Sequence, residues 1–71
     1  MRAVLHPADP NIVYVCSSHG LWCSTDAGRS WAWFKDLPFG SAQNVAFEPK
    51  DPKTIYVTTF GGGTWRGPHL P

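Results

Sequence analysis

An internal repeat dominates this sequence and limits the folds that the chain can adopt. Residues 4–24 read VLHPADPNIVYVCSSHGLWCS, and residues 46–67 read AFEPKDPKTIYVTTFGGGTWRG. The Pro-x-Asp-Pro and Tyr-Val motifs recur 42 positions apart, as Pro7 and Pro49 illustrate. After one additional glycine in the second copy, the Gly-x-Trp motif recurs 43 positions apart. Residues at equivalent positions of the two copies are called counterparts below.

Each copy of the repeat predicts short antiparallel strands joined by tight turns. Runs of β-branched and aromatic residues are typical of strands, and the Pro-x-Asp-Pro segments are typical of turns. No segment shows a sustained apolar period of 3.6 residues, and seven Pro and seven Gly interrupt the chain, so no helix is expected. The predicted strands are residues 2–6, 11–17, 21–24 and 31–34 in the first copy, and residues 43–47, 54–60 and 64–67 in the second. The predicted fold class is therefore all-β, with a four-stranded antiparallel unit followed by a three-stranded one.

Residues 24–31 read STDAGRSW and form a turn motif between two predicted strands. The Asp26 carboxylate can accept hydrogen bonds from backbone N–H groups one to three residues ahead. Gly28 supplies the positive φ that a tight loop needs, and Ser30 can bond across the loop. Trp31 is expected to start the next strand and to bury its ring against the base of the hairpin.

This pattern, Ser-x-Asp-x-Gly-x-Ser-Trp, resembles the Asp-box, also called the bacterial neuraminidase repeat. The matching residues are Ser24, Asp26, Gly28, Ser30 and Trp31. The Asp-box occurs in β-propellers of sialidases, xyloglucan-degrading glycoside hydrolases and sortilin-type receptors, where it is structural and lies far from the chemistry. A repeat period in the low forties is also the size of one four-stranded propeller blade. The resemblance implies a first blade over residues 1–40, with the Asp-box hairpin at 24–31, and a second, incomplete blade over residues 41–71.

The 71 residues hold fewer than two blades, whereas a complete propeller takes about four to eight. Only 15% of the residues are charged and 14% are aromatic, which predicts apolar surface on both outer sheet faces. The expected partners are further propeller blades, from a longer parent chain or by oligomerisation. The net charge of +1 gives no electrostatic reason to expect binding to nucleic acid or to a membrane. No signal peptide is visible, and the cellular location stays open, although the resembling families are often secreted or periplasmic.

Carboxylates are the first candidates for chemistry, because glycosidases need two acids beside the scissile bond. Asp9 and Asp51 are counterparts in equivalent turns, and Asp26 belongs to the motif described above. Asp36 and Glu48 remain as a conceivable pair, but structural roles are favoured for both. No catalytic residue is therefore assigned.

The histidines and cysteines predict no metal or cofactor site. His6, His19 and His69 lack the spacing of ligand pairs and are expected to face solvent. Cys16 and Cys23 lie on the two arms of a predicted hairpin, where they form either a disulfide or, as favoured here, two buried thiols.

Three aromatic residues without counterparts, Trp33, Phe39 and Phe60, could stack on sugar rings, although burial between blades is favoured. Trp22 and Trp65 are counterparts and are expected to be packing residues. The expected function is that of a structural propeller repeat that offers an interaction surface, with carbohydrate as one candidate partner, and that is not catalytic alone. One alternative is the C-terminal part of a glycoside hydrolase whose catalytic acids lie outside this chain. Another is a sortilin-like peptide-binding propeller.

Overall fold

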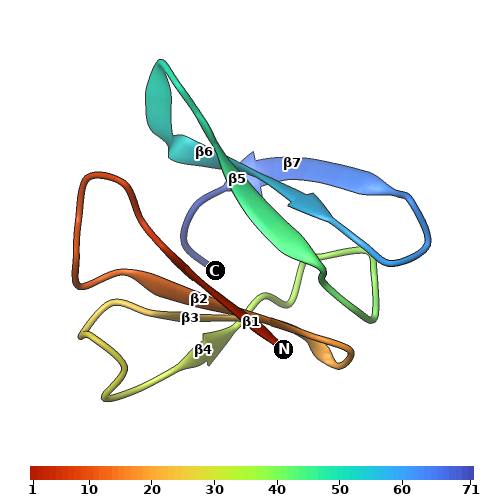
Figure 1. Cartoon of the computed structure of the whole chain (residues 1–71), viewed down its shortest axis with the longest axis horizontal. Coiled ribbons are helices and arrows are strands. Elements are labelled where there is room, and N and C mark those ends of the chain that lie inside the picture. The colour runs from red at the N-terminus through yellow and green to blue at the C-terminus, as the bar shows by residue number, and fades with distance from the viewer.

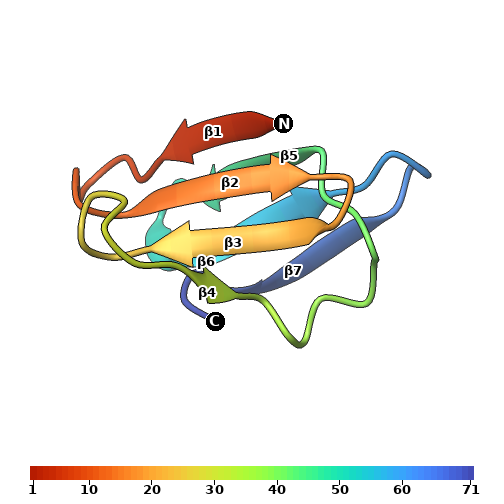
Figure 2. The same cartoon turned by 90° about the horizontal axis from the view of Figure 1, so that it is seen from below.

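A computed structural model describes all residues, 1–71, as two antiparallel β-sheets stacked in two layers without a helix. Figure 1 shows the two layers from the side, and Figure 2 shows the four strands of the first sheet in front of the second. The predicted fold class is confirmed. No helix of a length and hydropathy suited to crossing a membrane is present.

Both sheets are built from consecutive hairpins. The first sheet has the order β1 (Arg2–Leu5), β2 (Val13–Ser17), β3 (Gly20–Ser24) and β4 (Ala32–Trp33), and the second has the order β5 (Asn44–Glu48), β6 (Asp51–Thr58) and β7 (Thr64–Pro68). β6 begins three residues earlier than predicted, because a register shift between Phe47 and Glu48 lets pairing continue into the turn. β4 is shorter than predicted and contains only Ala32 and Trp33. The division into separate propeller blades at residues 1–40 and 41–71 stays a prediction.

The hydrophobic core lies between the two sheets. Side chains alternate along each strand, so every second residue faces the other sheet. The core residues are Tyr14, Cys16, Leu21 and Cys23 from the first sheet, Val45, Ile55 and Val57 from the second, and Ile12, Phe34, Leu37 and Ala42 from the connections. Complete burial of such a side chain stabilises a fold by roughly 1.5–3 kcal/mol. This shared core holds the two sheets together.

Two buried polar side chains link the sheets. The Tyr14 hydroxyl donates to the carbonyl of His69 at 2.7 Å. His6 Nδ1 accepts from the backbone N–H groups of Ala8 and Asp9, so Nε2 carries the ring proton and donates to the carbonyl of Pro52 at 3.0 Å. The prediction that His6 faces solvent is wrong: the side chain is only 8% exposed, because backbone groups satisfy both ring nitrogens.

The two cysteines are free and buried, as the favoured alternative expected. Strand pairing places Cys23 opposite Tyr14 and Cys16 opposite Leu21, so the thiols are not directly opposite each other. Burial raises the pKa of Cys16, and it raises the pKa of Cys23 to about 11. Both side chains therefore contribute to the core as small apolar groups.

Candidate functional site

The loop at residues 24–31 is closed by hydrogen bonds around one carboxylate. Asp26 accepts from the hydroxyl of Ser24 at 2.8 Å, from the hydroxyl of Ser30 at 2.5 Å and from the backbone N–H of Ser30 at 2.9 Å. These hydrogen bonds, led by the Ser30 hydroxyl, lower the pKa of Asp26 to about 2. The Ser24 hydroxyl also accepts from the N–H of Gly28, whose φ is 94°. The Asp26 carboxylate thus has a structural role in this loop. Its backbone donor Ser30 lies four residues ahead, one residue beyond the predicted range of one to three.

Trp31 differs from its prediction. Its ring is 42% exposed, and its indole N–H donates to the carbonyl of Gly28 at 3.2 Å. β4 begins one residue later, at Ala32, so the ring lies against its own loop and not at the base of the hairpin. The identification of this loop as an Asp-box stays a prediction.

The outer face of the first sheet, which points away from the second sheet, is apolar. It consists of Ala3, Leu5, Val13, Val15, Trp22 and Trp33. Leu5 is 65% exposed and Trp33 is 46% exposed, and the ring centroids of Trp22 and Trp33 lie 6.4 Å apart. None of these six side chains carries a charge or a hydrogen-bonding group other than the indole N–H. This surface is called the outer apolar face below.

The counterparts of the residues on the outer apolar face are packed between the two sheets. They are Val45, Phe47, Ile55, Val57 and Trp65, and they lie on the face of the second sheet that packs against the first sheet. The repeat therefore places matching apolar residues on two sheet faces. One of these faces is covered by the first sheet, and the other is open.

The outer face of the second sheet is polar, which corrects the expectation of two apolar outer faces. It carries Asn44, Ala46, Glu48, Thr54, Tyr56, Thr58, Thr64 and Arg66. The Tyr56 hydroxyl donates to Glu48 at 2.5 Å, and the Thr54 hydroxyl donates to Asp51 at 2.7 Å. Such a face can remain in water, so only the first sheet exposes a large apolar face.

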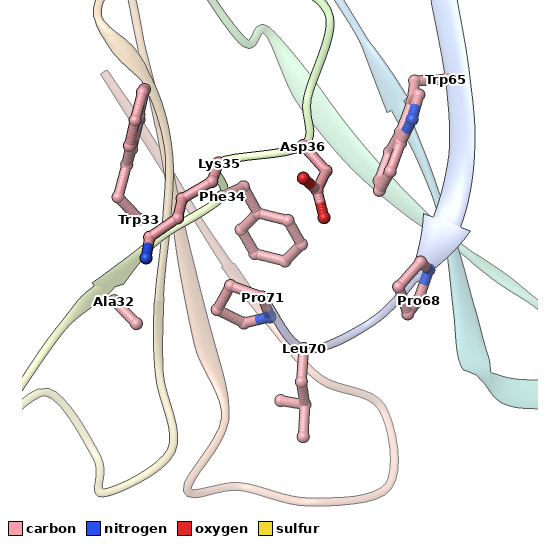
Figure 3. A pocket seen from close by; sticks show the side chains of 9 residues that line it. All are labelled: Ala32, Trp33, Phe34, Lys35, Asp36, Trp65, Pro68, Leu70 and Pro71. Carbon is pink, nitrogen blue, oxygen red and sulfur yellow. The ribbon is translucent and has the colours of Figure 1, made fainter.

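A cavity of about 460 Å³ opens between the edge strands β4 and β7. Figure 3 shows the nine residues that line it: Ala32, Trp33, Phe34, Lys35, Asp36, Trp65, Pro68, Leu70 and Pro71. The rings of Phe34 and Trp65 meet edge to face, with centroids 6.4 Å apart. The carboxylate of Asp36 points into the opening between these rings, whereas the Lys35 amino group points away (Figure 3). The cavity thus has aromatic walls and one acceptor at its mouth.

The structure separates the two carboxylates that remained as a conceivable acid pair. Asp36 lines the cavity, whereas Glu48 lies on the outer face of the second sheet in a hydrogen bond with Tyr56. No three His, Cys, Asp or Glu side chains are grouped so that they could hold a metal ion. The arrangement suits binding by packing and backbone hydrogen bonds.

The three aromatic residues considered for sugar stacking lie in different surroundings. Trp33 is on the outer apolar face beside Trp22, Phe39 packs against the core near Gly63, and Phe60 is exposed in the β6–β7 turn. The ring pairs of the chain include neither Phe39 nor Phe60, so a shared platform stays a prediction.

Comparison with curated proteins shows a similarity over part of the chain. The chain is 34% identical over 55 residues to vacuolar protein sorting/targeting protein 10 of Sordaria macrospora. The alignment covers 65% of this chain, and it spans only 4% of the relative's length. No protein-family model matches the chain, and no solved structure does.

Proposed function

We propose that this chain is a non-catalytic pair of propeller-type blades that serves as an interaction unit of a sorting-receptor-like protein. In this proposal the outer apolar face binds a further β-sheet of the same repeat type. The relation between covered and open counterparts carries the proposal. Val13 and Val15 are partly exposed and Trp22 is 39% exposed, whereas their counterparts Ile55, Val57 and Trp65 pack against the first sheet.

The covered face also indicates what kind of surface fits the open one. The second sheet packs against a face that presents Tyr14, Cys16, Leu21 and Cys23, none of which is charged at neutral pH. A partner sheet with aromatic, small and branched apolar residues at these positions would bury the outer apolar face in the same way. Burial of apolar area would then be the main favourable contribution to binding.

The similarity to a vacuolar sorting/targeting protein supports the part of the proposal that concerns a sorting receptor. Sortilin-type receptors are among the families that the 24–31 loop resembles, and the relative is by name a vacuolar sorting/targeting protein. No observation favours the glycoside hydrolase alternative, and none favours carbohydrate as a ligand. The activity and partners of the whole parent protein remain part of the proposal, because the chain matches a small part of the relative.

Light scattering on the full chain tests the proposed function. In the absence of such a partner sheet, we expect the wild type to self-associate at micromolar concentrations by packing two outer apolar faces together. We expect the double variant Leu5→Lys, Trp22→Lys to be monomeric with an unchanged circular dichroism spectrum. Thr58→Lys on the polar outer face is the matched control and should associate like the wild type. A well-folded wild-type monomer at all concentrations would contradict the proposal, because its apolar face would then be stable in water.

A further inference from the structure

Two Asp-Pro peptide bonds occupy counterpart turns of the repeat, Asp9–Pro10 before β2 and Asp51–Pro52 at the start of β6. The proline nitrogen of such a bond carries no hydrogen and takes up a proton more readily than an ordinary amide nitrogen, so it is a better leaving group. A carboxylate placed beside the bond can act as an internal nucleophile. The surroundings of the two carboxylates therefore determine which of the two bonds is reactive.

Both carboxylates are held across their own Asp-Pro bond. Asp9 Oδ1 accepts from the backbone N–H of Asn11 at 3.0 Å, and Asp51 Oδ1 accepts from the backbone N–H of Lys53 at 3.1 Å. The ring that each hydrogen bond closes contains the aspartate carbonyl carbon and the proline nitrogen, as in an Asx-turn. This arrangement keeps the carboxylate near the carbonyl carbon, and such proximity replaces a collision between separate molecules.

The second carboxylate oxygen distinguishes the two turns. Asp51 Oδ2 accepts from the Thr54 hydroxyl at 2.7 Å, whereas Asp9 Oδ2 has no hydrogen bond within the chain. The counterpart of Thr54 is Ile12, which has no hydroxyl. The hydrogen bonds to Asp51, led by the one from Thr54, lower the pKa of this carboxyl, and a carboxylate stabilised in this way is a weaker nucleophile. Asp9 Oδ2 is not stabilised in this way and is therefore the better nucleophile.

The carbonyl group of Asp9 is also activated. Its oxygen accepts from the backbone N–H of Ile12 at 3.1 Å. A donor at this oxygen stabilises the negative charge that develops there when the carbonyl carbon is attacked. The backbone N–H of Asp9 donates to Nδ1 of the buried His6 at 3.2 Å, so the turn is held on both sides of the aspartate. The turn thus combines a free carboxylate oxygen, an activated carbonyl group and a proline leaving group.

We propose that the Asp9–Pro10 bond is a site of acid-promoted self-cleavage, which the chain carries out with its own carboxylate and one water molecule. Asp9 Oδ2 attacks the carbonyl carbon of the same residue, the bond from this carbon to the nitrogen of Pro10 breaks, and the nitrogen leaves with a proton from solvent. The five-membered anhydride that remains on Asp9 adds water and opens to two carboxyl groups. The products are residues 1–9, which contain β1, and residues 10–71. The reaction does not depend on the proposed function.

Incubation of the full chain in mild acid tests this site. The measurement is made at the lowest pH at which circular dichroism shows the native spectrum, at about pH 4 or above, where an ordinary aspartate is at least half ionised. Mass spectrometry follows the fragments that begin at Pro10 and at Pro52. We expect hydrolysis after Asp9 to be about tenfold faster than after Asp51, which is the effect of one hydrogen bond to a charged group on a rate. In the same chain unfolded in urea, both bonds should break at similar rates.

Three variants separate the carboxylate chemistry from the fold. Asp9→Asn keeps an acceptor for the N–H of Asn11 but removes the nucleophile, so cleavage after residue 9 should stop. Thr54→Val frees the second oxygen of Asp51 and should accelerate hydrolysis after Asp51 about tenfold, whereas Thr54→Ser keeps the hydroxyl and should behave like the wild type. The proposal fails if neither bond breaks, if the folded chain is hydrolysed equally fast after Asp51 and Asp9, or if Asp9→Asn or Thr54→Val leaves the rates unchanged. None of these outcomes affects the light-scattering test of the proposed function.

Discussion

The two sheets of this chain arise from one repeat, yet their outer faces differ. Cys16, Leu21 and Cys23 face the core, whereas their counterparts Thr58, Thr64 and Arg66 face water. On the alternate positions the matching residues are apolar in both sheets, but only those of the second sheet are covered. The repeat therefore sets the strand pattern, while the neighbour of each face determines whether that face is polar. The outer face of the second sheet is polar, whereas the outer face of the first sheet exposes apolar side chains to solvent.

The largest expected effect comes from truncating counterparts on the covered and open faces. Ile55→Ala should lower the free energy of unfolding by about 2–5 kcal/mol, because Ile55 is completely buried between the sheets. Val13→Ala, at the counterpart position on the outer apolar face, should lower it by less than about 1 kcal/mol in the monomeric chain. Urea unfolding measures both values. Equal losses in a monomer would mean that the two faces do not differ in burial.

A smaller effect is expected from the counterpart tyrosines. Tyr14→Phe removes the hydrogen bond to the carbonyl of His69 that links the two sheets, and it should cost about 1–2 kcal/mol. Tyr56→Phe removes a bond to Glu48 on the polar outer face and should change stability by less than about 0.5 kcal/mol. Thermal and urea unfolding compare the variants. A larger loss in Tyr56→Phe would show that the outer face of the second sheet contributes more than its contacts indicate.

The smallest effect concerns acid stability, which compares the 24–31 loop with the turn before β6. The pKa of Asp26 lies at about 2 in the folded chain, below its usual value of 3.8, so the unfolded chain binds more protons in this range. The stabilising effect of this carboxylate is present above about pH 4 and is lost as the pH falls through 2. Asp26→Asn should flatten the decline of the melting temperature between pH 4 and pH 2.

Asp51→Asn is the matched variant for this measurement. Asp51 accepts two hydrogen bonds, from Lys53 and Thr54, which also lower its pKa, whereas Asp26 accepts three. We therefore expect Asp51→Asn to flatten the acid profile less than Asp26→Asn does. The opposite order would contradict the central role of Asp26 in its loop.

Most of the fold could be predicted from the sequence, because strand and turn signals are local. The repeat, the prolines and the β-branched runs indicate all seven strands and their pairing into hairpins. The errors concern two side chains whose hydrogen-bond partners the sequence does not reveal. His6, at the end of the predicted strand 2–6, was expected to face solvent, but its ring is buried because Pro52, 46 positions away, supplies an acceptor. Trp31 was expected to be a core residue, but its indole N–H donates a hydrogen bond to the carbonyl of Gly28 in its own loop.

The candidate site was less predictable. The cavity combines residues 32–36, 65, 68 and 70–71, which no motif connects in the sequence. The sequence feature nearest to this cavity is that the second copy of the repeat has three predicted strands and not four. This feature indicates an unpaired sheet edge, but it does not indicate a cavity beside that edge. Thr58, Thr64 and Arg66 indicate a polar outer face of the second sheet only when it is known which residues of β6 and β7 point outward. That knowledge requires the strand register, which the structure supplies.

The bond between Tyr14 and His69 has a consequence for how the chain folds. It joins residues 55 positions apart, whereas every strand pair within the sheets is a local hairpin. Local contacts form early because they close short loops, and distant ones form late. The hairpins of each sheet can therefore form before the two sheets dock, and the docking completes the structure. During translation, the inner face of the first sheet, with Tyr14, Cys16, Leu21 and Cys23, stays uncovered until the strands of the second sheet have been synthesised, and such exposed apolar surface makes a nascent chain prone to aggregate.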